Sequence, residues 1–377
     1  MEIPFLDLKR AYARYGHEIE DAVLKVLRSC RYLNGLQTTE LEKELANYIG
    51  VKYAVAVSSG TEALYLILKA LDLPQNSIVF VPSFTFVATA EVVVRSGLIP
   101  FFVDVEKDYP NISIDSLKEA YDLCVKRGYR PSCVIAVSLY GYPPRMSELL
   151  QFCQERNLFL VEDACQAFGS EFKNKKIGSF GIASGVSFYP TKNLSAAGDA
   201  GMVFTNDENL AFKIRVLKEH GQTKPYFYEY HGINGRMDEV QAAILRVKFK
   251  FFQEELGLRE KIATLYKEKL SQLYPLVKIF KEIPDSKPTL SLFTIRAEKR
   301  DQLQKYLENQ GIATNVYYRI PLHLQPSFRD DQPFVLSLPH TERLSQEVLS
   351  LPFFPYLTTE EVAIICDKIE KFYNLGS

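Results

Sequence analysis

The stretch YAVAVSSGTEALYLILKALDLPQNSIVFVP, residues 53–82, decides the fold class of this chain. Its first part, YAVAVSS (53–59), is a short apolar run that predicts a buried strand. TEALYLILKALDL (61–73) has apolar residues at helical spacing, and SIVFVP (77–82) again predicts a strand. A strand, a helix and a second strand in this order are typical of a parallel sheet covered by helices.

The same alternation continues through the N-terminal half of the chain. Helical spacing recurs at 85–97 and 147–157, and further strands are predicted for PFFVDV (100–105), CVIAVSLYG (133–141) and LFLVEDA (158–164). The sequence therefore predicts an α/β fold with a mostly parallel central sheet flanked by helices. In such sheets ligands bind beyond the carboxyl ends of the strands.

The second half of the chain differs in pattern. Helices are predicted for 209–221, 237–256, 259–273, 300–311 and 359–373, with strands near 290–296 and at 313–318. We expect a large α/β domain over residues 1–250 and a smaller α+β domain over residues 251–377. Residues 1–20 could pack on the small domain.

Composition excludes several classes of protein. The 377 residues carry a formal net charge of -1 and no long basic run, so neither nucleic acid nor an anionic membrane surface is expected as a partner. We expect no signal peptide and no membrane span, because charged residues or Pro82 interrupt every apolar stretch. The six cysteines form no CxxC pair, so no metal site is predicted and a cytoplasmic location is expected.

Common catalytic motifs are absent. The chain contains no HExxH, GxSxG, GxGxxG or GxxxxGK[ST] sequence. Zinc proteases, elbow-type serine hydrolases, dinucleotide-binding folds and P-loop enzymes therefore lack their usual signatures here.

A strand end near Ser59 predicts an anion site. SSGTEAL (58–64) joins a strand directly to a helix, and free N–H groups at a helix start attract phosphate. Gly60 allows close approach and Thr61 adds a hydroxyl. The alternative is that Ser59 or Thr61 only caps the helix.

Asp163 and Lys192 follow two later strands. Asp163 ends an apolar strand, where a carboxylate needs a cation such as a protonated pyridine nitrogen, although it could also be a helix cap. Lys192 stands among small residues in VSFYPTKNLSAAGDAG (186–201), and a desolvated lysine can form a Schiff base. Taken alone, such a lysine is more often a surface lysine. Ser187 points to the same edge and could hold a phosphate.

Phe86, in PSFTFVATA (82–90), could stack on a flat ring or belong to the core. Together these groups match a phosphate, an aromatic face, a pyridinium nitrogen and an aldehyde. The one ligand with all four is pyridoxal 5′-phosphate, and a lysine with an acidic partner is what a protein supplies to it.

The chain also resembles the DegT/DnrJ/StrS family of sugar aminotransferases, which have the aspartate aminotransferase fold (fold type I). The matching strings span nearly the whole sequence, namely IPFLDLKRAY (3–12), SSGTEAL, VPSFTFVATA (81–90), FFVDVEKDYPNI (101–112), VSLYGYP (137–143), VEDACQAFGS (161–170), SFYPTKNLSAAGDAG (187–201), GINGRMDEVQAAIL (232–245), YYRIPLHLQPSF (317–328) and LSLPFFPYLTTEEV (349–362).

The resemblance implies a role for each matching residue. Lys192 would bind the cofactor aldehyde, Asp163 the pyridine nitrogen, Phe86 the ring face and Gln166 the ring hydroxyl. The phosphate would be held by Gly60, Thr61, Glu62 and Ser187, together with Asn234 from the neighbouring subunit. The resemblance thus implies a homodimer with a composite active site. Substrate contacts would come from Tyr189, Tyr317, His323 and Arg236, and the tyrosines and His323 could instead pack between the domains.

The chain departs from the family pattern near the lysine. Ser195 and Ala200 stand where family members often have glycine, which puts loop geometry in question but removes no chemistry. Family members that act as sugar dehydratases carry histidine in place of the lysine, and this chain keeps Lys192.

The implied activity is transamination of a nucleotide-linked keto sugar for amino-sugar biosynthesis, in surface polysaccharides or secondary metabolites. L-glutamate is the expected donor and a 3-keto-6-deoxyhexose the expected acceptor, in a ping-pong cycle between pyridoxal and pyridoxamine phosphate. Two alternatives remain open at this point. One is a dehydratase or cyclitol aminotransferase of the same fold, and the other is a cofactor-binding regulatory protein without turnover.

Overall fold

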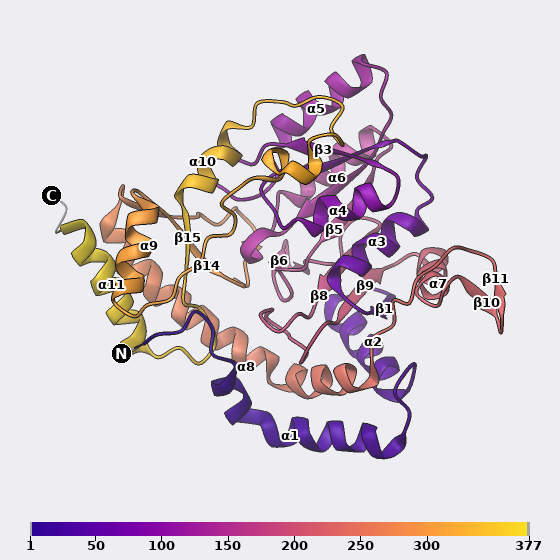
Figure 1. Cartoon of the computed structure of the whole chain (residues 1–377), viewed down its shortest axis with the longest axis horizontal. Coiled ribbons are helices and arrows are strands. Elements are labelled where there is room, and N and C mark those ends of the chain that lie inside the picture. Colours follow the sequence, from indigo (N-terminus) through magenta and orange to yellow (C-terminus); the bar gives the residue numbers. More distant parts are fainter. Residues whose placement is uncertain (1, 375–377) are drawn as a thin grey trace.

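A seven-stranded sheet organises the N-terminal two thirds of the computed structural model, which describes residues 2–374 (Figure 1). Its spatial order is β1 (Tyr53–Val57), β9 (Gly201–Thr205), β8 (Ala183–Ser187), β5 (Phe159–Asp163), β4 (Pro131–Val137), β2 (Ile78–Pro82) and β3 (Ile99–Val103). All strands run parallel except β9, which is antiparallel to both β1 and β8. The predicted α/β class with a mostly parallel sheet is confirmed.

Helices cover both faces of this sheet, so its strands lose contact with water on both sides. Strand β2 is buried at every position, as expected for a central parallel strand. The covering helices are α2 (Leu36–Ile49), α3 (Gly60–Ala70), α4 (Ala88–Arg95), α5 (Ile114–Lys126), α6 (Met146–Glu155) and α7 (Glu208–Leu217).

The predicted strand over 133–141 ends earlier than the sequence pattern suggests. Val137 pairs with Asp163, the last residue of β5, and only the Ser138 N–H, which donates to the Asp163 oxygen at 3.1 Å, continues the contact with that strand. Residues 139–141 instead form the short helix η1 (Leu139–Gly141), in which Tyr140 has a φ of 58°. The apolar residues LYG continue the strand pattern because they are buried, although they do not extend the sheet.

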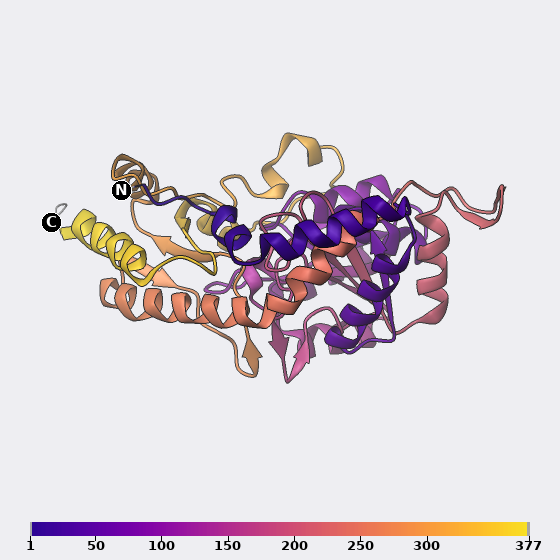
Figure 2. The same ribbon diagram turned by 90° about the horizontal axis from the view of Figure 1, so that it is seen from below.

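One long helix replaces the two helices predicted around residue 257. Helix α8 (Glu239–Leu270) is continuous, and α1 (Leu8–Ser29) packs along it (Figure 2). Gly257 does not interrupt α8, since a single glycine costs a helix only about 1 kcal/mol. Residues 250 and 251 both lie inside α8, and the domain division there stays a prediction.

The C-terminal part of the chain forms a second, antiparallel sheet with the order β12 (Val277–Ile279), β14 (Phe293–Ala297) and β15 (Val348–Leu351). Helices α9 (Arg300–Asn309), α10 (Pro339–Glu347) and α11 (Thr359–Asn374) accompany it. The N-terminal segment reaches this region, because Ile3 forms a parallel bridge with Ile312 and Arg10 pairs with Glu361 at 2.6 Å.

The strand predicted at 313–318 is wrong. Only Asn315 makes a bridge there, to Ser350, and the segment otherwise lacks strand pairing. The backbone oxygen of Tyr317 accepts a hydrogen bond from the hydroxyl of Tyr140 instead of joining a sheet. The ring of Tyr318 packs against those of Phe84 and Phe86, which lie after β2.

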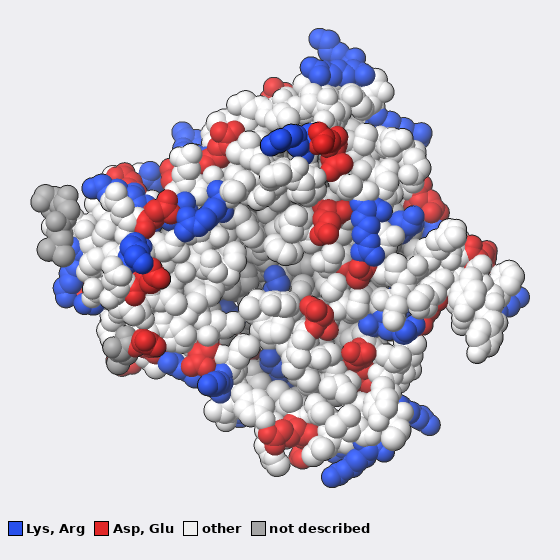
Figure 3. Space-filling view, viewed as in Figure 1, with Lys and Arg blue, Asp and Glu red and all other residues white. Residues whose placement is uncertain are grey.

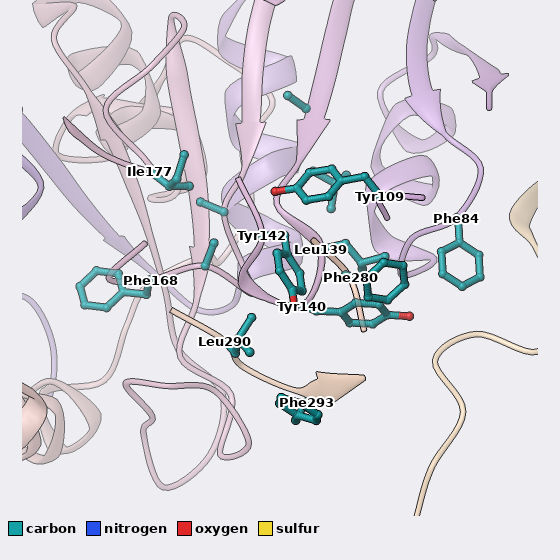
Figure 4. Packing of buried hydrophobic residues seen from close by; sticks show 14 of the residues in the cluster. Phe84, Tyr109, Leu139, Tyr140, Tyr142, Phe168, Ile177, Phe280, Leu290 and Phe293 are labelled. Carbon is teal, nitrogen blue, oxygen red and sulfur yellow. The ribbon is translucent and has the colours of Figure 1, made fainter. Parts of the chain in front are cut away.

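Aromatic packing joins the two sheets. The rings of Tyr140 and Tyr142 lie 6.1 and 5.9 Å from that of Phe280, which follows β12 (Figure 4). Tyr109 packs on Tyr142 at 5.6 Å and donates a hydrogen bond to the Pro143 oxygen. The floor beneath the carboxyl ends of β4 and β5 is thus a rigid, mostly apolar layer.

Two smaller hairpins leave the main body. β6 (Glu171–Phe172), β7 (Lys175–Lys176) and β13 (Ser286–Lys287) form a three-stranded ribbon, and β10 (Gln222–Lys224) with β11 (Phe227–Tyr228) forms a hairpin that projects from the molecule (Figure 1). Short helical turns η2 (Ser271–Leu273), η3 (Leu322–Leu324) and η4 (Pro326–Phe328) complete the described elements.

Acidic and basic side chains are mixed over the face seen in Figure 3, which is hollowed near its centre. Within residues 2–374, no helix is long and apolar enough to cross a membrane. No group of three or more His, Cys, Asp or Glu side chains in that range is placed to hold a metal ion.

Candidate active site

The carboxyl ends of three strands bring the predicted polar residues together. Asp163 ends β5, Ser187 ends β8, and Gly60 begins α3 directly after β1. A Cβ atom added to Gly60 would lie 2.6 Å from the Cβ of Ser187, so the two segments touch. Only glycine permits this approach, which explains the residue at this position.

Lys192 lies in the loop that follows β8. Its backbone N–H donates to the Tyr189 oxygen at 2.9 Å, and the loop closes where the Phe188 N–H donates to the Ala200 oxygen at 2.8 Å. The ammonium group makes no hydrogen bond or ion pair to any part of the chain that the structure describes. Desolvation lowers the pKa of Lys192, and the nearby Cys165 and Asp163 oppose this shift.

Asp163 is held in place without being neutralised. Its Oδ2 accepts a hydrogen bond from the Thr89 hydroxyl at 2.7 Å, and its Oδ1 accepts one from the Cys165 N–H at 3.2 Å. The side chain is buried and has no ion pair within the described residues. Each carboxylate oxygen can accept a further bond, so the group is oriented and still available to a cation.

The start of α3 shows that capping and anion binding are compatible. Ser59 is the N-cap, and its hydroxyl accepts a bond from the Glu62 N–H at 3.1 Å, as the simpler interpretation predicts. The N–H groups of Gly60 and Thr61 donate to nothing within residues 2–374. Two free donors at a helix start, beside the Ser187 hydroxyl, are suited to a phosphate.

Glu62 is already bound to two other residues. Its Oε1 pairs with Arg95 at 2.5 Å, and Arg95 also lies 3.9 Å over the ring of Tyr65. Its backbone N–H is occupied by Ser59. A role for Glu62 toward a phosphate stays a prediction.

Phe86 and Gln166 face the same region. Phe86 is 51% exposed, which does not fit a core residue, and its ring lies 6.3 Å from that of Tyr318. Gln166 accepts a bond from the Tyr140 N–H at 2.9 Å through Oε1 and donates to the Tyr318 hydroxyl at 3.3 Å through Nε2. The amide is therefore oriented by two partners.

The predicted substrate residues fall into two settings. Tyr189 is exposed. Desolvation raises the pKa of the Tyr317 hydroxyl, and the nearby Tyr189 raises it further. His323 has a side chain only 2% exposed, with Nδ1 2.6 Å from the Ser83 hydroxyl and Nε2 3.4 Å from Glu342. Desolvation lowers the pKa of His323. In this structure His323 fastens η3 between β2 and α10, and a sugar contact stays a prediction.

Asn234 and Arg236 lie on the far side of β1. Asn234 is exposed and bridges Glu219 through the backbone, while Arg236 pairs with the Glu219 carboxylate at 2.9 Å. The Gly235 oxygen between them accepts a bond from the Ser58 N–H at 2.9 Å. The exposed amide of Asn234 is free to reach a neighbouring molecule.

Sequence reasoning missed three residues that shape the site. Thr89 orients Asp163, Tyr318 orients Gln166, and Cys165 lies beside Lys192, Gly60 and Asp163. Burial raises the pKa of the Cys165 thiol. Apart from the contact between Cys165 and Asp163, which are two residues apart, these contacts join segments that are far apart in the sequence. No local spacing therefore predicts them.

Comparison with known proteins identifies relatives over almost the full length. A "pleiotropic regulatory protein" of Geobacillus stearothermophilus is 38% identical over 99% of both chains. The "dTDP-3-amino-3,4,6-trideoxy-alpha-D-glucose transaminase" of Streptomyces venezuelae is 36% identical over 98% of this chain and 96% of its own. The crystal structure of S. venezuelae DesV in complex with a ketimine intermediate superposes with a TM-score of 0.94, at 36% identity and 98% coverage of each chain.

The family model for the DegT/DnrJ/EryC1/StrS aminotransferases matches residues 14–370. Aminotransferases of this family use pyridoxal 5′-phosphate. The residues present fit that group, since an unpaired lysine, an oriented carboxylate, an exposed aromatic ring and free helix N–H groups meet at one sheet edge. This chain therefore belongs to the DegT/DnrJ/EryC1/StrS aminotransferase family.

Proposed function

We propose that this protein transfers an amino group from L-glutamate to a keto group on a nucleotide-linked hexose, with a 3-keto-6-deoxyhexose as acceptor. The observation that carries the proposal is the ammonium group of Lys192, which lacks any described partner and lies near the oriented carboxylate of Asp163. A lysine that only served solubility or structure would be hydrated or paired.

Each residue contributes a distinct property to that reaction. Bound pyridoxal phosphate would supply an aldehyde for amines and a ring that accepts electrons. Lys192, desolvated and therefore less basic than a surface lysine, is suited to take and return a proton at the reacting carbon. Asp163 provides the fixed negative charge that keeps a ring nitrogen protonated. Thr89 keeps that carboxylate in the required orientation.

Phe86, Gln166 and the start of α3 position the ligand. Phe86 offers an exposed ring face, and Gln166, fixed by Tyr140 and Tyr318, presents its amide at the same edge. The N–H groups of Gly60 and Thr61, with the Ser187 hydroxyl, are suited to the phosphate.

The acceptor assignment rests on two supports. The S. venezuelae relative is named for a 3-amino sugar linked to dTDP. In this chain Tyr189 lies near Tyr317, and tyrosine hydroxyls can donate and accept hydrogen bonds with sugar hydroxyls.

A regulatory function without turnover is the second candidate. It is favoured by one observation, the name of the Geobacillus stearothermophilus relative, which is 38% identical. The intact arrangement of Lys192 and Asp163 supports catalysis instead, because binding alone needs no unpaired lysine.

The test uses protein loaded with pyridoxal phosphate. Addition of 15N-L-glutamate should change the visible spectrum, and a dTDP- or UDP-linked 3-keto hexose added next should yield a 15N-amino sugar by mass spectrometry. Lys192→Ala should abolish both steps, and the matched Lys218→Ala variant should retain both. A spectral change without amino-sugar formation over a panel of keto sugars would favour the regulatory candidate.

We also propose a homodimer in which Asn234 completes the neighbouring subunit's site. Asn234 is exposed, and the projecting hairpin that precedes it carries the exposed aromatic residues Tyr226, Phe227, Tyr228 and Tyr230. Exposed aromatic groups at such density are typical of protein interfaces.

Subunit mixing tests the composite site. Lys192→Ala and Asn234→Ala homodimers should both be inactive or severely impaired. Mixing them under exchange conditions should restore roughly a quarter of wild-type activity, because half of the dimers would be mixed and one of their two sites intact. No recovery, with exchange verified by mass spectrometry, would contradict the composite site.

A further inference from the structure

Arg259 of α8 is buried without a hydrogen-bonding partner. It is 5% exposed, and its guanidinium makes no hydrogen bond or ion pair to any described residue. Its Nε and Nη1 atoms are also shielded from solvent. The ring of Phe353, 5.4 Å from the guanidinium carbon, covers one face but cannot satisfy the in-plane N–H groups. A buried, charged group in this state is costly unless another group accepts its bonds.

A small cavity adjoins Arg259 and the loop that carries Lys192. Its volume is about 30 Å³, and its lining includes Lys192, Ser195, Lys248, Glu255 and Arg259. A cavity of that size holds about one or two atoms of the size of a water oxygen or a chloride ion. It is too small for a sugar or an amino acid.

Positive charge dominates this cavity. Glu255 has one oxygen that accepts the hydroxyls of Tyr15 and Tyr356, at 2.9 and 3.2 Å, and it forms no ion pair with Arg259. The ammonium group of Lys248 donates to the Ser195 hydroxyl at 2.5 Å. Burial lowers the pKa of both Arg259 and Lys248, that of Lys248 to about 8, and the charge of Glu255 opposes both shifts without forming an ion pair with either side chain.

Asp7 is the other carboxylate in the lining, and it is engaged with Arg10 at 3.2 Å. A larger groove also touches Arg259 on its other side, but the cations there are already paired. Lys176 pairs with Glu171 at 2.7 Å, and the Lys267 pair with Glu282 is 2.5 Å. The small cavity is therefore lined by cations that form no ion pair with any described residue.

We propose that Arg259 and Lys248 bind a small monovalent anion of chloride size behind the Lys192 loop. The anion accepts hydrogen bonds from the free N–H groups of Arg259 and offsets the charge of Lys248. It thereby ties α8 to the loop through Ser195 and stabilises the loop that presents Lys192. This site is separate from the phosphate-binding region, and the inference does not rest on the proposed function.

The test is a halide titration of protein saturated with pyridoxal phosphate, so that the phosphate-binding region is already filled. Sodium chloride replaces sodium gluconate at constant ionic strength, because gluconate is too large for the cavity. The thermal midpoint of unfolding should rise saturably, by about 3 °C at high occupancy. Bromide should behave alike and give an anomalous scattering peak beside Arg259 in a crystal.

Matched variants assign the effect to Arg259. Arg259→Gln should remove the saturable rise, while Lys250→Gln, which removes an exposed cation from the same helix, should keep it. If Arg259→Gln does not fold, Lys248→Met should weaken halide binding at least fivefold, measured by 35Cl NMR line broadening.

Three results would overturn the proposal. The first is a wild-type midpoint that does not respond to halide at constant ionic strength. The second is an equal response in Arg259→Gln. The third is ordered water only, with no bromide peak at saturating bromide.

Discussion

Lys192 and Lys218 both lose water on folding, and they differ in what surrounds the ammonium group. Lys218 is buried behind β1, where it donates to the Ala56 oxygen at 2.9 Å and lies 4.0 Å from Glu42. Lys192 lies in a loop at the sheet edge, and its ammonium group donates to no described group. Desolvation lowers the pKa of each.

The difference shows that burial alone does not mark a reactive lysine. Lys218 belongs to a satisfied network in which Glu42 also pairs with Arg215 at 2.8 Å. The amine of Lys192 stays available because it has no hydrogen-bonding partner, and the nearby carboxylate of Asp163 is already oriented by Thr89. Lys218 therefore has a structural role and Lys192 a chemical one, although both are lysines that lose contact with water. The two roles predict different effects of mutation.

The largest effect is expected for Lys192→Ala. Removing the amine should lower transaminase turnover by about 10,000-fold or more, because it acts as both nucleophile and proton carrier. The free energy of unfolding should fall little, since the ammonium group makes no described contact. Steady-state kinetics measure the turnover, and urea denaturation measures the free energy of unfolding. A large loss of stability would place Lys192 in the same class as Lys218.

Asp163→Asn should lower turnover by about 100- to 1000-fold, as expected when one preorganised electrostatic partner is removed. The amide keeps the Thr89 contact but not the negative charge. Affinity for pyridoxal phosphate, followed by absorbance, should weaken less than turnover. If the variant and the wild type had equal turnover, Asp163 would have no role in the reaction.

Glu162, next to Asp163 in the sequence, should affect the pH dependence of the free energy of unfolding rather than turnover. Glu162 points into the interior, accepts the Gly178 and Phe180 N–H groups at 3.0 and 2.6 Å, and burial raises its pKa to about 8. The folded state thus keeps this proton to higher pH than the unfolded state does.

Stability should therefore fall as pH rises from 5 to 8, by up to about 3 kcal/mol. Urea denaturation across that range should show the slope in wild type and a flatter profile in Glu162→Gln. Parallel profiles in the two proteins would mean that Glu162 is already ionised when folded.

The smallest effect is expected for Lys218→Ala, which should lower the free energy of unfolding by about 2 kcal/mol through a lost hydrogen bond and a small cavity. Turnover should stay within about twofold of wild type, since the ammonium group of Lys218 contacts Ala56 and Glu42 and none of the residues predicted to hold the cofactor. A large loss of turnover at unchanged stability would mean that Lys218 acts in the reaction, and it would contradict the structural role given to this side chain.

The sequence alone determined the fold class and the main ligand. Short apolar runs that alternate with helical patterns in residues 53–82, and the recurrence of this alternation, predicted the parallel sheet, because strands buried on both faces read as nearly continuous apolar runs. Residue types that each match one part of pyridoxal phosphate, together with the family resemblance, predicted Lys192, Asp163 and Phe86.

Only the tertiary structure decided which polar groups have partners. Thr89 meets Asp163 across 74 positions, Tyr318 meets Gln166 across 152, and His323 lies against Ser83 across 240, and no local pattern encodes such contacts. The isolation of Arg259 and the contrast between Lys192 and Lys218 are likewise properties of packing. Sequence specifies which chemistry a side chain can perform, and the folded environment decides whether its bonds are already used.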